Sequence, residues 1–133
     1  MVDRTGLPLS CVLSGANRND AKMLEAVVKA VPPFDRGSVL PPRGVKLHAD
    51  KGYDFDFCRS LLRQQGLVPR IARRGVESSE RLGKHRWVVE RTHSWLSQFR
   101  RLRVRYERRD DIHLGFSVLG CSLICFRELQ KVL

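Results

Sequence analysis

The sequence predicts an α/β fold with a mostly parallel sheet. Two short apolar segments with the character of strands, residues 45–50 and 67–72, lie on either side of a segment with helical periodicity, residues 54–65. A strand, a helix and a second strand in succession form a parallel βαβ unit. The chain has 133 residues, of which 42% are hydrophobic and 29% charged, so it is long enough for one domain with a buried core.

The chain opens on an expected β-hairpin. Residues 3–6 have the composition of a turn, and the short apolar run of residues 7–14 follows as the second arm. Almost nothing precedes the turn, so we expect the chain to begin inside a supersecondary unit.

A helix is expected over residues 20–31. Asn19 or Asp20 can cap its N-terminus, because either side chain accepts hydrogen bonds from the first amides of a helix. The apolar residues of this segment form one stripe, and prolines at 32 and 33 end it. Residues 32–44 hold four prolines and two glycines, which predicts a loop.

In the βαβ unit, Asp50 ends the first strand and Gly52 lets the chain turn away from it. The helix over residues 54–65 should end at Gly66, which suits the left-handed position after a helix. The side chains expected to face the core are Phe57, Cys58, Leu61 and Leu62.

Two further helices are expected over residues 84–99 and 111–130. Heptad-like spacing places Val88, Thr92, Trp95 and Phe99 on one face of the first. The second contains the longest uncharged stretch, residues 112–126, which is 15 residues long. A membrane span needs roughly 20 residues, so a buried or interface helix is favoured.

The net charge of +11 predicts a polyanionic partner, nucleic acid first and an anionic membrane surface second. Residues 70–109 hold 13 Lys or Arg and four acids, and so carry +9 of this charge. Twelve of the 13 are Arg, which forms bidentate contacts with phosphate. A solvated basic face is the alternative, ranked lower because solubility favours mixed charge.

The four cysteines, Cys11, Cys58, Cys121 and Cys125, form no CxxC pair. Cys121 and Cys125 lie one helical turn apart in an apolar segment, where cysteine usually packs as a small hydrophobe, and a metal site there is the less favoured alternative. The first residues lack the apolar core of a signal peptide, which predicts a cytoplasmic protein without disulfides.

Two carboxylates are candidates for chemistry. Asp50 stands at the carboxyl end of a strand, where parallel sheets place their sites, and Glu90 is an acid on an otherwise basic, polar helix face. Taken singly, Asp50 could cap the next turn and Glu90 could pair with Arg86. Taken together in a basic chain, they suggest phosphoryl chemistry assisted by Mg²⁺, with a third carboxylate supplied from elsewhere.

Two runs in the sequence closely resemble the DDE transposases of bacterial insertion sequences. They are His48-Ala49-Asp50-Lys51-Gly52-Tyr53-Asp54 and Arg86-Trp87-Val88-Val89-Glu90-Arg91-Thr92-His93-Ser94-Trp95-Leu96. Shorter matches are Gly6-Leu7-Pro8-Leu9, Ser14-Gly15-Ala16-Asn17, Phe99-Arg100-Arg101-Leu102 and Arg105-Tyr106-Glu107-Arg108, so the resemblance covers nearly the whole chain.

The resemblance implies an RNase H-like fold, a mixed sheet flanked by helices, in which two Asp and one Glu bind two Mg²⁺ or Mn²⁺ ions. It assigns Asp50 as the second Asp, Glu90 as the Glu and Arg86 as the Arg of the family signature Y-x2-R-x3-E-x6-K. The Tyr position of that signature is Gly83 here, and the Lys position is Ser97.

The family's first Asp lies upstream of the hairpin, and Asp3 does not match its position. We therefore expect residues 1–133 to form a single, N-terminally incomplete catalytic domain. Its expected parts are a strand and helix part at 1–72, a basic segment with the Glu-bearing helix at 73–109, and an apolar helix at 110–133. A second reading frame, a truncated element and a domain fragment are the open explanations.

The expected function is DNA transposition, in which phosphodiester cleavage and strand transfer depend on metal ions. The alternatives are an inactive DNA-binding remnant, another RNase H-like nuclease and a basic module that dimerises through residues 112–126. The expected partners are DNA and either a second copy of this chain or an upstream fragment of the transposase. The expected location is the bacterial cytoplasm, at the nucleoid, with no membrane partner. The residues expected to contact DNA are Arg73, Arg74, Lys84, Arg86, Arg91, Arg100, Arg101 and Arg105.

Overall fold

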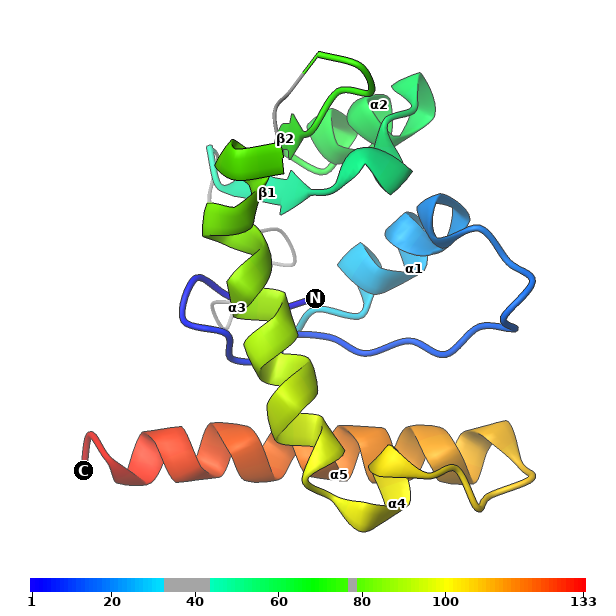
Figure 1. The fold of residues 1–133 in the computed structure, drawn as a ribbon, viewed down its shortest axis with the longest axis vertical. Helices are drawn as coiled ribbons and strands as arrows, with labels where there is room; N and C mark the ends of the chain where they lie inside the picture. The colour runs from blue at the N-terminus through cyan, green and yellow to red at the C-terminus, as the bar shows by residue number, and fades with distance from the viewer. Residues whose placement is uncertain (33–43, 77–78) are drawn as a thin grey trace. The chain divides into compact units, whose positions relative to one another are not determined.

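The structure is a computed structural model that describes residues 1–32, 44–76 and 79–133, with side chains left out at 79–86. The chain divides into two compact units (Figure 1). The sheet unit is Ser14–His85, and the helical unit combines Met1–Leu13 with Arg86–Leu133. Most of the predicted loop at 32–44 lies outside the described residues, as do the side chains of Lys84 and Arg86.

The sheet unit contains the predicted βαβ succession. Strand β1 (Lys46–Ala49) pairs in parallel with β2 (Val68–Ile71), and helix α2 (Asp56–Gln64) connects them. The register places Lys46 opposite Val68 and Ala49 opposite Ile71. The α/β class is thus confirmed, and the sheet has two strands within the described residues.

Helix α2 ends as predicted at Gly66, whose φ is +74°. The amide of Gly66 donates to the carbonyl of Arg63 at 3.0 Å, and the amide of Leu67 donates to the carbonyl of Leu62 at 2.9 Å. This pair of bonds satisfies the last carbonyls of the helix and turns the chain directly into β2.

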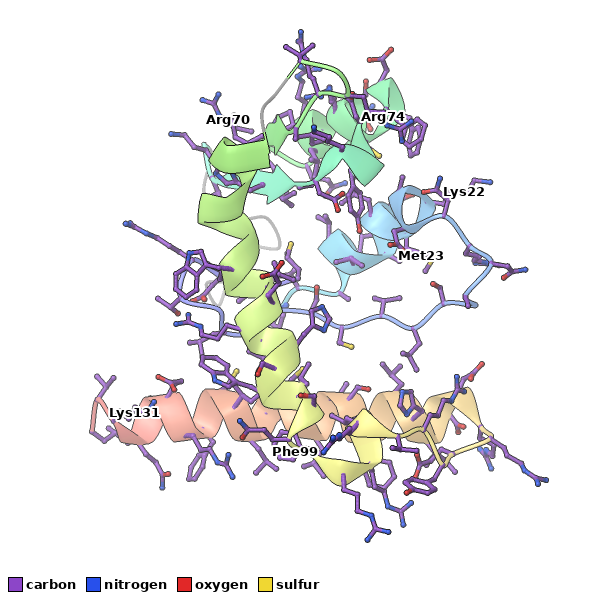
Figure 2. The ribbon with its side chains drawn as sticks, in the orientation of Figure 1. Lys22, Met23, Arg70, Arg74, Phe99 and Lys131 are labelled. Atoms are coloured by element: carbon purple, nitrogen blue, oxygen red, sulfur yellow. The ribbon has the colours of Figure 1, made fainter. Side chains whose placement is uncertain are left out.

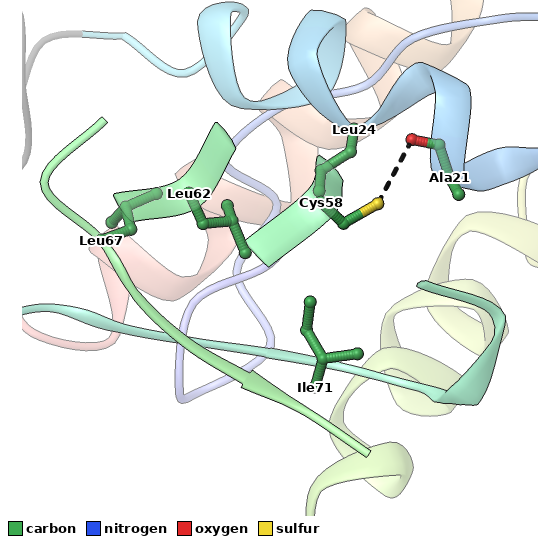
Figure 3. Packing of buried hydrophobic residues seen from close by; sticks show 6 residues of the cluster. All are labelled: Ala21, Leu24, Cys58, Leu62, Leu67 and Ile71. Carbon is green, nitrogen blue, oxygen red and sulfur yellow. Dashed lines mark hydrogen bonds between the residues drawn. The ribbon is translucent and has the colours of Figure 1, made fainter. Parts of the chain in front are cut away.

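The core of the sheet unit lies between α2, the two strands and the preceding helical segment. It consists of Ala21, Leu24, Cys58, Leu62, Leu67 and Ile71 (Figure 3). The Cys58 thiol is fully buried, contacts the carbonyl oxygen of Ala21 at 3.8 Å, and has its pKa raised by that burial. The expectation that Phe57 faces the core is wrong, because its side chain is 52% exposed and stacks on Phe55 instead.

The helix predicted over residues 20–31 is present in two parts. A 3-10 turn, η1 (Asp20–Met23), leads into α1 (Leu24–Lys29). Asn19 is the N-cap, since its side-chain oxygen accepts a hydrogen bond from the Ala21 amide at 2.9 Å. The cap prediction is confirmed.

The helical unit contains α4 (Arg100–Arg103), α5 (Asp110–Gln130) and most of α3 (Ser79–Ser97). Helix α3 begins five residues before the predicted start at 84. Residues 79–84 carry a single apolar side chain, Leu82, so periodicity could not reveal this first part. The one-turn helix α4 was not expected within the basic stretch.

The end of α3, the turn of α4 and the middle of α5 meet at Gly120. A Cβ atom at this position would lie 2.9 Å from Leu102, 3.3 Å from Leu96 and 3.4 Å from Phe99. Figure 2 shows Phe99 where these three helices come together. Gly120 therefore permits this close approach, and a larger residue would require the Leu102 side chain to shift.

Helix α5 buries only a narrow face within its unit, consisting of Ser117, Gly120 and Ile124. Its length and its hydropathy of 1.4 over an 18-residue window make it the one described helix capable of crossing a bilayer, with 17% of that window buried. Core helices of soluble proteins can have the same length and hydropathy, but they are mostly buried. The expectation of a buried helix is thus not met within the described residues, whereas an interface role stays a prediction.

The expected turn at residues 3–6 is confirmed. The Asp3 carboxylate accepts hydrogen bonds from the amides of Thr5 and Leu7, each at 2.8 Å, and Gly6 adopts a φ of +87°. Pairing of the two arms is limited to one antiparallel bridge between Val2 and Pro8, so no hairpin strand forms in the described residues.

Candidate functional site

Asp50 follows directly after β1, as the sequence predicted, and is exposed. Its Oδ1 accepts a hydrogen bond from the Gly52 amide at 2.9 Å, so Asp50 caps the 3-10 helix η2 (Lys51–Tyr53). A Cβ atom at position 52 would lie 3.0 Å from that oxygen, a tight contact that the glycine avoids. Among the described residues Oδ2 has no hydrogen-bond partner, so the cap leaves one oxygen of Asp50 for a ligand.

The loop after Asp50 is tied to the end of β2 through Asp54. Its Oδ1 accepts from the Arg59 guanidinium at 2.6 Å, and its Oδ2 accepts from the Arg74 amide at 2.9 Å. Arg74 also donates through Nε to the Lys51 carbonyl at 3.0 Å. These bonds fix the backbone on both sides of η2, and therefore the direction in which Asp50 leaves the sheet.

The same network holds the pKa of Asp54 below its usual value. The hydrogen bond from the Arg74 amide is the largest cause, and the hydrogen bond from Arg59 is the next. Sequence reasoning quoted Asp54 within the first motif but gave it no role. Its spacing of five residues from Arg59, on a helix that starts between them, is the signal that could have pointed to an ion pair.

Glu90 lies on α3 and is exposed, with His93, Ser94 and Ser97 exposed on the same side. Thr92 is 3% exposed, and Trp95 is half-buried. The predicted division of this helix into a polar face and a packed face is thus confirmed. The expected pair with Arg86 lies outside the described residues.

The stretch next to Glu90 is anchored to the N-terminal turn. The Thr92 hydroxyl donates to the Gly6 carbonyl at 2.6 Å, and the Arg91 guanidinium donates to the Thr5 carbonyl. The Arg91 guanidinium also lies over Trp87 at 4.5 Å and over Trp95 at 4.9 Å. Arg91 therefore connects α3 to the turn, and its guanidinium already contacts two aromatic rings.

A shallow pocket of about 400 Å³ opens beside this anchor in the helical unit. Its lining consists of Arg4, Thr5, Trp87, Arg91, Trp95, Glu128 and Lys131. Trp87 is 48% exposed, so part of its ring is accessible in a pocket that three cationic side chains also line.

The expected DNA-contacting residues differ in how they are held. Arg74 and Arg91 make the intramolecular bonds described above, while Arg101 and Arg105 pair with Glu107 and Asp110. The Arg100 guanidinium lies 6.0 Å from the Tyr106 ring. Arg73 is exposed and makes no ion pair within the described residues. Their contacts with DNA stay predictions.

The two candidate carboxylates belong to different units, Asp50 to the sheet unit and Glu90 to the helical unit. Their convergence on one metal site stays a prediction. No group of three His, Cys, Asp or Glu side chains within reach of a common ion occurs in the described part of the chain.

The sequence pattern of the transposase DDE domain matches residues 1–125, almost the whole chain. The chain belongs to the DDE transposase family. A protein of Burkholderia cepacia with the name "Putative transposase for insertion sequence element IS402" is 50% identical over 134 aligned positions, which cover 98% of this chain. The chain spans 63% of the length of that relative. No solved structure matches this chain.

Membership of the DDE transposase family confirms the resemblance seen in the sequence, while the roles of Asp50 and Glu90 stay predictions. Both motif runs, around Asp50 and around Glu90, lie within the matched residues 1–125. The family match thus includes the segment that carries each carboxylate, one in each unit.

Proposed function

We propose that this protein acts in DNA transposition of an insertion sequence, with Asp50 and Glu90 as two of the three carboxylates of an RNase H-like catalytic centre. The observation that carries the proposal is the position of Asp50. It is an exposed carboxylate directly after a strand of a parallel βαβ unit, inside a chain of the DDE transposase family.

The donor groups suit a hard divalent cation. Asp50 has one carboxylate oxygen outside its cap, Glu90 is exposed, and carboxylate oxygens are the ligands that Mg²⁺ and Mn²⁺ prefer. Bound metal would supply activation of the attacking oxygen and stabilisation of the leaving one. The chain's own part is to hold Asp50 through the Asp54 network and Glu90 through the Thr92 and Arg91 anchor.

The DNA partner is supported by charge. Residues 70–109 carry +9 of the net +11, and arginine suits phosphate because its guanidinium donates two parallel hydrogen bonds. Binding to duplex DNA should depend steeply on salt and weakly on sequence, since phosphate contacts release condensed counterions. The bacterial cytoplasm, association with the nucleoid and self-association belong to the same proposal.

The test is a transposition assay on the whole protein, comparing the wild type with Asp50→Asn and Glu90→Gln. Loss of strand transfer in both variants, with folding retained, is the expected result, and transfer at the wild-type rate in either would contradict the proposal. Residues 1–133 alone should cleave no DNA in Mg²⁺ or Mn²⁺, because the family's first Asp has no counterpart among them. Cleavage by this chain that Asp50→Asn abolishes would contradict the assignment of a third carboxylate elsewhere.

A further inference from the structure

The segment from α4 to the first residues of α5 is the most basic part of the helical unit. Residues 100–111 contain six arginines and three acids. The arginines are Arg100, Arg101, Arg103, Arg105, Arg108 and Arg109, and the acids are Glu107, Asp110 and Asp111. All twelve residues are described with their side chains.

Three of the arginines are held by the three acids. Arg101 pairs with Glu107 at 2.5 Å, Arg105 pairs with Asp110, and Arg109 pairs with Asp111 at 2.6 Å. Each carboxylate of the segment is thus taken by one guanidinium. These pairs connect α4, the turn and the first residues of α5.

The pair of Arg101 and Glu107 is the most enclosed of the three. The Glu107 side chain is 5% exposed, and hydrogen bonding to Arg101 is the main cause that lowers its pKa. Moving Arg101 away would leave a carboxylate that water scarcely reaches without its cation. Arg101 therefore stabilises the turn through its ion pair with Glu107.

The remaining arginines of the segment, Arg100, Arg103 and Arg108, are exposed and have no carboxylate partner among the described residues. Arg100 and Arg103 lie on the single turn of α4. The Arg100 guanidinium is 6.0 Å from the Tyr106 ring, a contact that leaves its N–H groups available.

We propose that Arg100, Arg103 and Arg108 are the arginines of this segment that contact DNA phosphates, and that Arg101, Arg105 and Arg109 fold the turn that presents them. This assignment rests on the proposed DNA binding and deepens it. It replaces Arg101 and Arg105 of the sequence-based set with Arg103 and Arg108, which that set did not include.

The physical reason is local charge. An arginine paired with a carboxylate adds almost no net positive potential. A phosphate that binds its guanidinium also lies beside the carboxylate that the arginine has left, and the two negative charges repel. An unpaired arginine adds a full charge and releases a counterion when it meets a phosphate. The salt dependence of binding therefore separates the two groups of arginines.

The experiment compares two double variants that remove the same charge, Arg103→Gln with Arg108→Gln and Arg105→Gln with Arg109→Gln. Binding of a fluorescent duplex is measured over a series of salt concentrations, and thermal unfolding is followed for each protein. Losing two phosphate contacts should reduce the slope of log K against log salt by about 1.8, at roughly 0.9 per phosphate. We expect this reduction for the first variant, with an unchanged unfolding midpoint, and a reduction below about 0.9 for the second.

Equal reductions in the two variants would overturn the assignment and leave the proposed DNA binding intact. A wild-type slope near zero would overturn the proposed DNA binding, and the assignment with it. If the Arg105 and Arg109 variant does not fold, the comparison is made between Arg103→Gln and Arg109→Gln. The pair of Arg109 and Asp111 is exposed on both sides, at 73% and 64%, so its loss should leave the unit folded.

Discussion

The hydroxyl of Thr92 donates a hydrogen bond of 2.6 Å to the carbonyl oxygen of Gly6, across 86 residues of sequence. Thr92 stands two residues after Glu90, and Gly6 lies in the N-terminal turn at a φ of +87°. A Cβ atom at position 6 would lie 3.2 Å from the Thr92 hydroxyl, so the glycine makes this approach possible. The bond therefore fixes the turn of α3 that carries Glu90 against the start of the chain.

Replacing Thr92 by Val keeps the shape of the side chain and removes the donor. The Gly6 carbonyl then loses a buried partner, and the unfolding free energy should fall by about 1–3 kcal/mol. Urea unfolding measures this loss. Thr92→Ser is the control, because it keeps the hydroxyl and removes one methyl group at a cost of about 0.8 kcal/mol. A Val variant as stable as the wild type would show that the bond contributes nothing.

The core of the sheet unit depends on Leu62, which is fully buried among Cys58, Leu67 and Ile71. Leu62→Ala should lower the unfolding free energy by about 2–5 kcal/mol, because lost burial and a residual cavity add together. Phe57→Ala, on the same helix, should cost much less, since Phe57 is 52% exposed. Similar losses in the two variants would contradict the described core.

Asp54 makes stability depend on pH. Its pKa is lowered in the folded state, so its contribution is present above the unfolded value of about 3.9 and is lost as the pH falls through the lower folded value. Asp54→Asn should therefore be less stable than the wild type at neutral pH, with a difference that shrinks toward pH ~2. Unfolding curves over this range measure the difference.

The control for Asp54 is Asp56→Asn, because Asp56 is exposed and makes no hydrogen bond or ion pair within the described residues. It should change stability little and equally at each pH. A difference between wild type and Asp54→Asn that stays constant with pH would contradict the role given to the network of Arg59 and Arg74.

The βαβ unit could be predicted because its signals are local. Two apolar strands, a helix with one apolar stripe and a glycine at position 66 determine the succession, and each appears in the structure. The burial predicted for Phe57 was wrong because helical periodicity alone does not distinguish residues in the middle of the apolar stripe from residues at its border. Its stacking on Phe55 is a contact that spacing does not reveal.

The candidate carboxylates were predictable from motif runs, but the residues that hold them were not. Thr92 and Gly6 are 86 positions apart, and Asp54 meets the Arg74 amide across 20 positions, so no local pattern joins them. The pairing of arginines with acids between α4 and α5 was also invisible. Charge counting gives the total for this segment and not the partner of each guanidinium.

The central proposal is that Asp50 and Glu90 contribute to one metal centre, and Mn²⁺ titration tests it most directly. The titration uses wild type, Asp50→Asn, Glu90→Gln and both changes together, with Glu25→Gln as a control at an exposed acid paired with Lys29.

Each single change should weaken Mn²⁺ binding at least about tenfold, which is a loss of ~1.4 kcal/mol of binding free energy. The double variant should bind Mn²⁺ about as tightly as the single variant with the lower affinity. The proposal places the two carboxylates close enough to repel each other in the metal-free protein, so neither change should lower the unfolding free energy. Unchanged Mn²⁺ affinity in Asp50→Asn or in Glu90→Gln would contradict the shared metal site.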